Sequence, residues 1–349
     1  MSQTMKAALL TGIRKLEIGE MPRPRIERDT DVLLRIREVG VCGSDVHYYT
    51  TGRIGSQVVK YPFPVGHECA GTVEEVGRAV RRVRPGDRVA VEPAMSCGQC
   101  DQCRAGRLHT CRKTRFLGCP GQAEGSLCEY VVMPQDCCYP VPDGLSLEQA
   151  SLAEPLSIGI YSTKLAGDLR GRTLAFLGFG PIGISAFMAA RKAGAEVAYV
   201  TEPIGARAEQ ARRQGAAWVG DPARQDVVRE ILSREPLQMD FVFECCGKQE
   251  ALDQAIDLLK PGGKLLFIGI PEVDRVSFAC DPIRRREICI QNVRRQNHCM
   301  QPAIDFLHGQ PGIMDFAITH RFPFERTKEA FDLVADYRDG VIKAMIHVA

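Results

Sequence analysis

The distribution of apolar and polar residues divides the chain into two kinds of sequence. Up to about residue 155, short runs of β-forming residues, such as 31–39 and 71–76, are separated by turns that contain Gly or Pro. From about residue 172, apolar runs alternate with helical stretches. This alternation predicts a parallel sheet with crossover helices, following a compact and strand-rich first part.

The end of the chain departs from that alternation. The run 288–293 is a candidate last strand of the parallel sheet, and the residues after it return to short strands and helices. We therefore expect a first domain over 1–156, a middle domain over 157–293, and a tail over 294–349 that rejoins the first domain. No repeat of fixed period and no low-complexity segment interrupts this plan.

Composition is consistent with a soluble protein of two domains. A chain of 349 residues exceeds what one core usually holds. Hydrophobic residues make up 45% and charged residues 25%, and no apolar run approaches the roughly 20 residues that span a bilayer. The first residues lack the features of a secretory signal, and the net charge of +2 gives no electrostatic case for nucleic acid. We expect a cytoplasmic protein that binds neither membrane nor nucleic acid.

The cysteines direct attention to metals, because fifteen of them without an export signal indicate metal ligation rather than a disulfide framework. Cys97, Cys100, Cys103 and Cys111 have the spacing C-x2-C-x2-C-x7-C in a Gly-rich stretch, which lets one loop surround a tetrahedral ion. Four thiolates leave no open coordination position, so we expect a structural zinc in a lobe over about 95–113. An iron–sulfur cluster and four reduced, buried cysteines are the alternatives.

A glycine-rich turn between a predicted strand and a predicted helix indicates a dinucleotide site. The pattern GxGxxG follows an apolar run and opens an Ala-rich helical stretch. In that setting the glycines permit a tight turn, a close approach to a pyrophosphate and close helix packing. The alternative is that these glycines only form a turn and bind no cofactor. The expected cofactor contacts are Gly178, Gly180, Pro181, Ile182 and Gly183.

An acidic residue follows at the end of the next predicted strand. Glu202 lies where a carboxylate accepts hydrogen bonds from the ribose hydroxyls of NAD and repels a 2′-phosphate. Arg207 lies where a guanidinium would meet such a phosphate or flank the adenine. With Glu202 in place, the sequence favours NAD over NADP.

Three dispersed segments supply ligands for a second metal. Cys42 in VCGSD, the pair His67 and Glu68, and Glu154 in LAEPLS are each weak signals alone, since a lone His or Glu is more often structural. A catalytic zinc needs about three protein ligands of Cys, His or carboxylate type and an open position. Their joint occurrence therefore predicts a catalytic zinc.

Together these residues resemble the zinc-containing medium-chain dehydrogenases, in the sorbitol (L-iditol) dehydrogenase branch, over nearly the whole chain. The segments that carry the resemblance are VCGSDVHYY, GRIG, VGHECAGTVEEVG, RPGDRVAVEP, LAEPLSIGIYS, GFGPIG and THRFPFE. The resemblance implies an α/β protein with a GroES-like, strand-rich catalytic domain and a Rossmann domain with a doubly wound parallel sheet. It also implies a homo-oligomeric enzyme, a dimer or tetramer, with two zinc ions per chain and NAD. Such an enzyme interconverts a secondary alcohol of a sorbitol-, xylitol- or iditol-like polyol and its ketose.

The resemblance also assigns residues around the catalytic zinc. The family's ligands map onto Cys42, His67 and Glu68, and the carboxylate at or near the metal, sometimes through water, maps onto Glu154. Two further positions belong to a proton path out of the site, with a structural role as the alternative. These are Ser44 and His47.

Three other positions fall where the family contacts substrate: Tyr48, Arg295 and Gln296. Arg295 matches an arginine that contacts polyol hydroxyls, whereas Gln296 replaces the usual tyrosine, which puts sorbitol itself in doubt. Arg294 adds a second guanidinium that favours an anionic or phosphorylated polyol, with a surface or inter-subunit role as the alternative.

Other functions stay open at this point. A threonine-type, cyclitol or polyol-phosphate dehydrogenase of the same family would use the same zinc and NAD sites. A zinc-free quinone reductase shares the two-domain plan but not the zinc ligands. A non-catalytic, NAD-binding redox sensor would use thiol pairs such as Cys245–Cys246, which are interpreted more simply as buried small hydrophobes. Zinc content separates the cases, at about two ions per chain for the enzyme and about one for the sensor.

Overall fold

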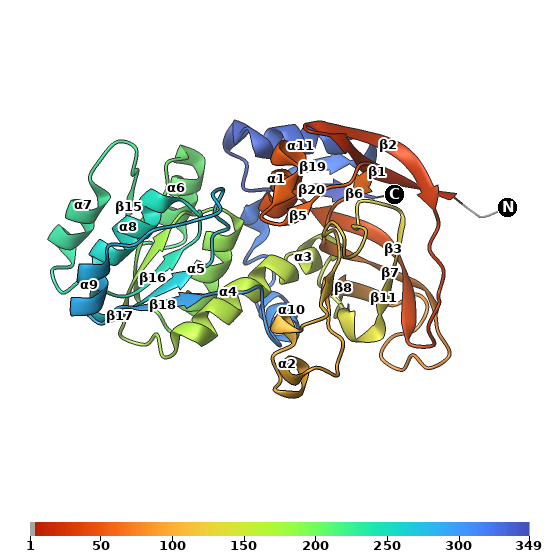
Figure 1. Cartoon of the computed structure of the whole chain (residues 1–349), viewed down its shortest axis with the longest axis horizontal. Coiled ribbons are helices and arrows are strands. Elements are labelled where there is room, and N and C mark those ends of the chain that lie inside the picture. The colour runs from red at the N-terminus through yellow and green to blue at the C-terminus, as the bar shows by residue number, and fades with distance from the viewer. Residues whose placement is uncertain (1–3, 349) are drawn as a thin grey trace. The chain divides into compact units, whose positions relative to one another are not determined.

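The computed structural model describes residues 4–348 and forms two compact units (Figure 1). The discontinuous unit comprises residues 1–154 and 300–349, and the middle unit comprises residues 155–299. The expected boundaries, after residues 156 and 293, fall close to these positions. In the described part of the chain, no helix is long and apolar enough to cross a membrane.

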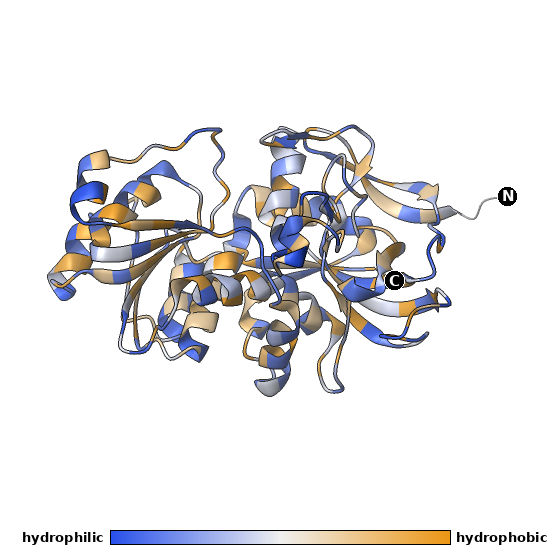
Figure 2. Ribbon diagram, turned by 60° about the horizontal axis from the view of Figure 1, so that its bottom comes forward, coloured by the Kyte–Doolittle hydropathy of each residue, from blue (hydrophilic) through white to orange (hydrophobic). Residues whose placement is uncertain are grey.

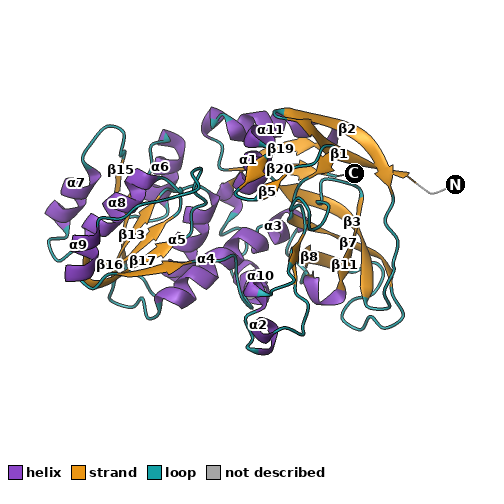
Figure 3. Ribbon diagram, viewed as in Figure 1, coloured by secondary structure: helices purple, strands orange, loops and turns teal. Residues whose placement is uncertain are grey.

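The middle unit is built on a six-stranded sheet in which every neighbouring pair of strands is parallel. In the order of the sheet, the strands are β15 (Trp218–Gly220), β14 (Val197–Thr201), β13 (Thr173–Leu177), β16 (Met239–Glu244), β17 (Leu259–Phe267) and β18 (Cys289–Asn292). The chain starts at β13, moves outward to β15 and then crosses to β16, so the two halves meet between β13 and β16. Figure 3 shows helices around this sheet. They are α4 (Ala153–Ala166), α5 (Pro181–Lys192), α6 (Gly205–Arg213), α7 (Val227–Arg234), α8 (Gln249–Leu258) and α9 (Cys280–Arg285). The predicted alternation of strands and helices is confirmed.

Aromatic packing fixes the centre of the middle unit. Phe176 of β13 stacks on Phe243 of β16 with ring centroids 4.8 Å apart, and Phe187 of α5 meets Phe176 edge-on at 5.3 Å. All three side chains are completely buried. Because helices cover the sheet, its strands read as continuous apolar runs rather than alternating ones. Figure 2 accordingly draws much of this sheet in the hydrophobic colours.

The discontinuous unit is built around a seven-stranded sheet with β3 near its centre. In the order of the sheet, the strands are β12 (Cys138–Pro140), β8 (Arg88–Val91), β7 (Glu68–Val76), β3 (Asp31–Gly40), β20 (Lys343–His347) and β19 (Ile318–Pro323), with β11 (Tyr130–Pro134) also paired to β3. A three-stranded sheet contains β2 (Lys15–Pro22), β1 (Thr4–Gly12) and β6 (Phe63–Pro64), and two ribbons pair β4 (Arg53–Ile54) with β5 (Gln57–Val58) and β9 (Ala94–Met95) with β10 (Arg115–Phe116). The helices are α1 (Gly43–Thr51), α2 (Asp101–Arg104), α3 (Leu147–Ser151), α10 (Met300–Gly309) and α11 (Thr327–Ala335). Short 3₁₀ turns cover Leu108–Thr110, Gln135–Cys137, Asp315–Ala317, Phe324–Arg326 and Arg338–Gly340.

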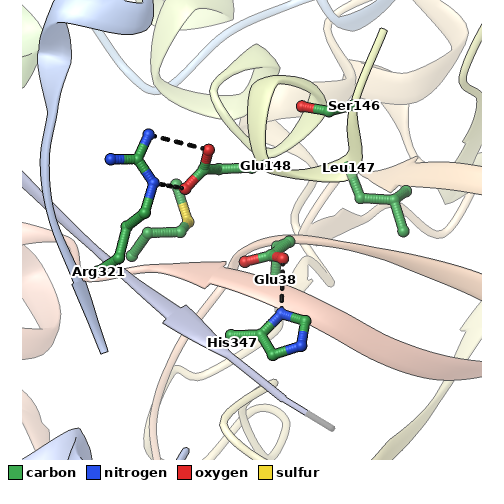
Figure 4. Close-up of a pocket in the computed structure, with 7 residues that line it drawn as sticks. Glu38, Ser146, Leu147, Glu148, Arg321 and His347 are labelled. Atoms are coloured by element: carbon green, nitrogen blue, oxygen red, sulfur yellow. Dashed lines mark hydrogen bonds and ion pairs between the residues drawn. The ribbon is translucent and has the colours of Figure 1, made fainter. Parts of the chain in front are cut away.

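The tail of the chain joins the first part through β20, which runs antiparallel to β3. Two ion pairs flank this junction and line a surface pocket of about 340 Å³ (Figure 4). Arg321 donates two hydrogen bonds to Glu148, at 2.6 and 3.1 Å, and His347 Nδ1 lies 2.8 Å from Glu38 Oε1. Exposed pairs of this kind each contribute only about 0–1 kcal/mol, so strand pairing and the apolar core hold the tail in place.

Close backbone packing fixes the loop that precedes β7. Gly66 has a φ of 99°, and a Cβ on Gly118 would lie 2.7 Å from the carbonyl oxygen of Gly66. A Cβ on Gly125 would lie 2.2 Å from the backbone of Val65, and the N–H of Ser126 donates to the carbonyl of Gly66 at 2.8 Å. The chain therefore enters β7 in one defined path, directly before two predicted metal ligands.

Candidate active site

Three predicted zinc ligands converge in the discontinuous unit. The potential ligand atoms of Cys42, His67 and Glu68 all lie within 4.8 Å of one another. Cys42 directly precedes α1, Glu68 is the first residue of β7, and His67 directly precedes that strand. His67 and Glu68 are buried and Cys42 is half-buried. A thiolate, an imidazole and a carboxylate suit a zinc ion whose fourth coordination position stays open.

Asp45 of α1 orients His67. This aspartate is completely buried, and its Oδ1 accepts the N–H of Gly66 at 3.2 Å and lies 3.2 Å from His67 Nδ1. Nδ1–H therefore donates to Asp45, which leaves Nε2 for a metal. Burial lowers the pKa of His67, but Asp45 and Cys42 outweigh burial and raise this pKa well above its usual value. The pocket thus favours positive charge at the place where a metal cation is expected.

A buried lysine holds Glu68. Lys343, the first residue of β20, is 1% exposed, and its Nζ donates to Glu68 Oε2 at 2.5 Å and to the carbonyl of Val41 at 3.1 Å. Burial lowers the pKa of Lys343, but the charge of Glu68 outweighs burial and the pKa is raised overall. A Cβ on Gly40 would lie 2.5 Å from Glu68 Oε2, so glycine there leaves room for the carboxylate. Because Lys343 occupies Oε2, we expect Oε1 at the metal.

Glu154 lies in the first turn of α4 and is buried. Burial raises its pKa to about 8, His67 acts in the opposite direction, and Glu68 raises the pKa further. Glu154 therefore interacts electrostatically with the cluster, although it lies outside the group of three close ligands. Its ligation, direct or through water, stays a prediction.

Helix α1 carries three further predicted site residues. Ser44 Oγ donates to Cys42 Sγ at 3.3 Å, which places a hydroxyl beside the cluster. Tyr48 is buried, and its hydroxyl donates to Gln57 Oε1 at 2.9 Å, so the group that was expected to contact substrate already has a protein partner. His47 is half-buried, and its place in a proton path stays a prediction.

The four spaced cysteines form a second group. Their Sγ atoms all lie within 4.8 Å of one another, with 4.0 Å between Cys97 and Cys103, 3.6 Å between Cys100 and Cys103, and 3.9 Å between Cys100 and Cys111. A tetrahedral zinc with Zn–S bonds of about 2.3 Å requires sulfur atoms about 3.8 Å apart. Hydrogen bonds from the backbone N–H groups of Cys103 and Arg112 lower the pKa of Cys100 to about 6. The lobe therefore fits a closed, structural zinc.

The glycine-rich turn lies in the middle unit, at the carboxyl end of β13. Gly178 has a φ of 97°, and α5 begins at Pro181 with Gly180 as its N-cap and Ile182 in its first turn. A Cβ on Gly183 would lie 2.0 Å from the carbonyl oxygen of Gly178, so only glycine permits this approach of helix to turn. The N-terminus of α5 is thus open to a phosphate, at the switch point where open α/β sheets bind dinucleotides.

Glu202 and Arg207 both reach this turn. The carboxylate of Glu202 is buried and accepts the N–H groups of Phe179 at 2.8 Å and Ile204 at 2.9 Å. Arg207 of α6 is also buried, and its Nη1 would lie 3.3 Å from a Cβ on Gly180. Glu202 therefore braces the turn, which sequence reasoning did not foresee, and Arg207 adds positive charge beside it.

The segment 294–296 contains the other residues expected to contact substrate. Arg294 is exposed, and Arg295 is half-buried with a φ of 52°, in the left-handed region. Gln296 Oε1 accepts the N–H of Cys299 at 2.7 Å, directly before α10. Gln296 thus has a backbone partner, and the contacts of all three residues with substrate stay predictions.

Sequence reasoning missed three residues of the zinc cluster's surroundings. They are Asp45, Lys343 and Phe116, whose ring centroid lies 5.1 Å from that of His67. Asp45 had a local signal, as the acid in VCGSD, and Lys343 had another, as the only charged residue between apolar neighbours in IKAMI. Phe116 had none, because nothing in its own segment indicates contact with His67.

Comparisons with known proteins identify the family of the chain. The family model for the alcohol dehydrogenase GroES-like domain matches residues 28–143, and the model for zinc-binding dehydrogenases matches residues 181–309. The sorbitol dehydrogenase of Bacillus subtilis is 36% identical over 99% of this chain and 98% of that protein. The L-idonate 5-dehydrogenase of Vitis vinifera is 35% identical over 98% of this chain and 94% of its own length.

Solved structures show the same architecture. A dehydrogenase of unknown specificity from Escherichia coli, 29% identical, superposes with a TM-score of 0.91 over 99% of this chain and 100% of its own. A structure from Sinorhizobium meliloti, described as a zinc-binding dehydrogenase bound to NADP, is 28% identical with a TM-score of 0.89 over 99% of both chains. The expected fold class, a GroES-like domain with a Rossmann-type parallel sheet, is confirmed.

Proposed function

This chain belongs to the zinc-binding alcohol dehydrogenases, in the branch that contains sorbitol dehydrogenase, and on that premise we propose that it interconverts a secondary hydroxyl of a polyol and the ketone with NAD. Membership makes the chain a zinc-dependent polyol dehydrogenase that acts on a small molecule. The observation that carries the proposal is the cluster of Cys42, His67 and Glu68, because these three ligands leave a coordination position for a substrate hydroxyl.

Zinc and NAD, when bound, supply chemistry that side chains lack. A zinc ion held by the cluster supplies Lewis acidity, of the kind that lowers the pKa of water from about 15.7 to about 7, and NAD supplies the hydride acceptor. Asp45 keeps His67 in one tautomer, and Lys343 keeps Glu68 in one orientation. The residues around the ligands therefore fix the site before substrate enters.

We assign the substrate's proton to groups on α1. Ser44 Oγ lies 3.3 Å from Cys42 Sγ, so a hydroxyl stands beside the position where a substrate hydroxyl would bind. His47 follows three residues later, which places both side chains on one face of the helix. Ser44 is proposed to accept the substrate's proton as it releases its own hydroxyl proton toward His47, which passes a proton to solvent.

Glu202 supports NAD as the cofactor. A carboxylate directly after β14 repels the 2′-phosphate of NADP, and its two oxygens are held by the N–H of Phe179 in the glycine-rich turn and by the N–H of Ile204. The Sinorhizobium meliloti relative nevertheless binds NADP, and Arg207 offers a guanidinium near the same turn. Activity with the two cofactors in parallel decides between them.

The substrate class rests on the relatives. Sorbitol dehydrogenases support a neutral polyol, and the L-idonate 5-dehydrogenase supports a second candidate, a polyol acid. The exposed guanidinium of Arg294, next to Arg295, favours the second candidate. Assembly as a dimer or tetramer and a cytoplasmic location stay predictions.

NADH formation by the zinc-loaded protein tests the proposal. The panel contains sorbitol, xylitol, L-iditol, L-idonate, galactitol 1-phosphate, an inositol and L-threonine. We expect NAD-dependent turnover of polyols, and Cys42→Ser and His67→Ala should abolish it while NADH binding survives, because the glycine-rich turn lies in the other unit. If the protein with two zinc ions bound forms NADH with no compound of the panel, or prefers L-threonine, the polyol assignment is excluded.

A further inference from the structure

The turn after β16 packs against the glycine-rich turn. Because β13 and β16 are neighbours at the switch point, a dinucleotide is expected between the turns that follow these two strands. A Cβ on Gly178 would lie 3.2 Å from the Cβ of Cys246, and a Cβ on Gly183 would lie 3.7 Å from the Cβ of Cys245. Cys246 is exposed, so the interpretation of this thiol pair as buried was wrong for Cys246.

Glu244, the last residue of β16, holds this turn and is completely buried. Its Oε1 accepts the N–H groups of Cys246 at 2.8 Å and Gly247 at 2.6 Å. Its carbonyl oxygen accepts the N–H groups of Ile268 and Gly269, both at 3.0 Å. One residue therefore connects the turn after β16 with the turn after β17.

Glycines at two positions permit the close packing of these two turns. A Cβ on Gly269 would lie 2.7 Å from Glu244 Oε2, and a Cβ on Gly247 would lie 2.3 Å from the carbonyl oxygen of Ile270. Burial raises the pKa of Glu244, and hydrogen bonds from Cys246, Gly247 and Gly269 act in the opposite direction. Burying a carboxyl group costs free energy unless the group is bonded in this way, and this cost points to a function of Glu244 in the turn.

Peptide geometry indicates that function. In a trans peptide, the N–H and the C=O point in opposite directions. The N–H of Cys246 shares a peptide with the carbonyl of Cys245, and the N–H of Gly247 shares one with the carbonyl of Cys246. Because both N–H groups face the carboxylate of Glu244, both carbonyl oxygens point away from it. We propose that Glu244 is a positioning residue that turns these two carbonyls outward to accept hydrogen bonds from the hydroxyl or carboxamide donors of the nicotinamide half of the cofactor. In a doubly wound sheet each half binds one mononucleotide, and the half that begins at β16 is expected to bind the nicotinamide mononucleotide. The proposal rests on the proposed function.

Three variants in the full-length, zinc-loaded protein test this role by NADH fluorescence titration. Glu244→Ala should weaken NADH binding about tenfold or more, because a misplaced turn loses aligned contacts. Glu244→Gln should stay within about threefold of the wild type, since the amide oxygen still accepts both N–H groups. Glu250→Ala, on the exposed face of the nearby α8, is the matched control and should change nothing. In turnover, the KM for NAD should rise in Glu244→Ala while the KM for polyol stays constant.

Alkylation of Cys246, followed by peptide mass spectrometry, gives a second measurement. NADH should protect this thiol in the wild type and protect it less in Glu244→Ala. If that variant does not fold, Glu244→Asp, which is one methylene too short to reach both N–H groups, should show the same loss. Wild-type NADH affinity in the Ala or Asp variant, or a Gln variant as weak as Ala, overturns the proposal. A wild type that holds two zinc ions but does not bind NADH contradicts the proposed function instead.

Discussion

Replacing Lys343 with methionine isolates the role of the buried ion pair, because methionine fills similar space without charge. In the metal-free protein the change leaves Glu68, 2% exposed, without its cation, and removing one partner of a buried pair costs about 3–5 kcal/mol. With zinc bound, a divalent cation beside Glu68 compensates for the missing lysine. The loss then approaches that of one hydrogen bond to a charged group, about 1.5–3 kcal/mol.

The two losses of stability are linked to zinc affinity through one thermodynamic cycle. Their difference, about 2 kcal/mol, predicts that Lys343→Met binds zinc roughly 30-fold more tightly than the wild type. The same variant should turn over more slowly. The positive charge of Lys343 close to the metal ligands stabilises the negative charge that develops on the substrate oxygen, and the methionine variant lacks this positive charge.

Competition with a chromophoric chelator measures zinc affinity, and denaturant unfolding with and without zinc measures the two losses. Lys343→Arg retains the charge and should keep wild-type zinc affinity. Lys328→Met is the matched control, because Lys328 forms an exposed pair with Asp332 on α11, worth at most about 1 kcal/mol. Unchanged zinc affinity in Lys343→Met, with equal destabilisation in the presence and absence of zinc, would refute the reasoning.

Three further predictions concern the metals. Asp45→Asn should weaken catalytic zinc binding about 10- to 100-fold, as measured by chelator competition, because a neutral amide replaces the charged acceptor that holds the Nδ1 proton of His67 and makes the ring a stronger ligand; unchanged affinity would contradict this role. Cys103→Ser should lower the zinc content from about two ions per chain to about one and reduce thermal stability, whereas retention of both ions would exclude the four-thiolate site. Zinc affinity should fall as pH falls from about 8 to about 6. The pKa of His67 is raised and that of Glu154 is about 8, so both groups hold protons in this range that zinc must displace. Zinc titrations at several pH values check this, and an affinity that does not change with pH contradicts it.

Much of the fold was predictable because its signals are local. The continuous apolar runs of β13, β16 and β17 arise from burial of the sheet on both faces, and the helical stretches between them have lengths typical of crossover helices. The glycines of the turn after β13 are required by backbone contacts within six residues of one another, so their spacing is visible in the sequence. The pairing of β20 with β3 was less accessible, since it joins residues about 300 positions apart and no periodicity reports strand partners.

The site was predictable to the extent that its ligands lie in short motifs. Cys42, His67 and Glu68 were identified from residue types and from the family resemblance, but the sequence contained no measure of their separation. Lys343 was missed because its partner lies 275 residues away and a lysine in a strand is usually solvated. Glu202 was expected to meet ribose hydroxyls, and its additional bond to the N–H of Phe179 depends on how the turn folds back.

The charge buried at the site argues for a bound cation independently of family membership. The carboxyl groups of Asp45, Glu68 and Glu154 are all buried, and Lys343 is a buried cation that interacts with two of them. Burial lowers the pKa of His67 but Asp45 and Cys42 outweigh it, and burial raises the pKa of Glu154 to about 8 with a further rise from Glu68, so both groups hold protons more strongly than usual. Apolar residues of similar volume would serve a purely structural core as well or better. The arrangement is therefore best explained as a binding site in which a divalent cation replaces those protons, so that zinc uptake and proton release are coupled.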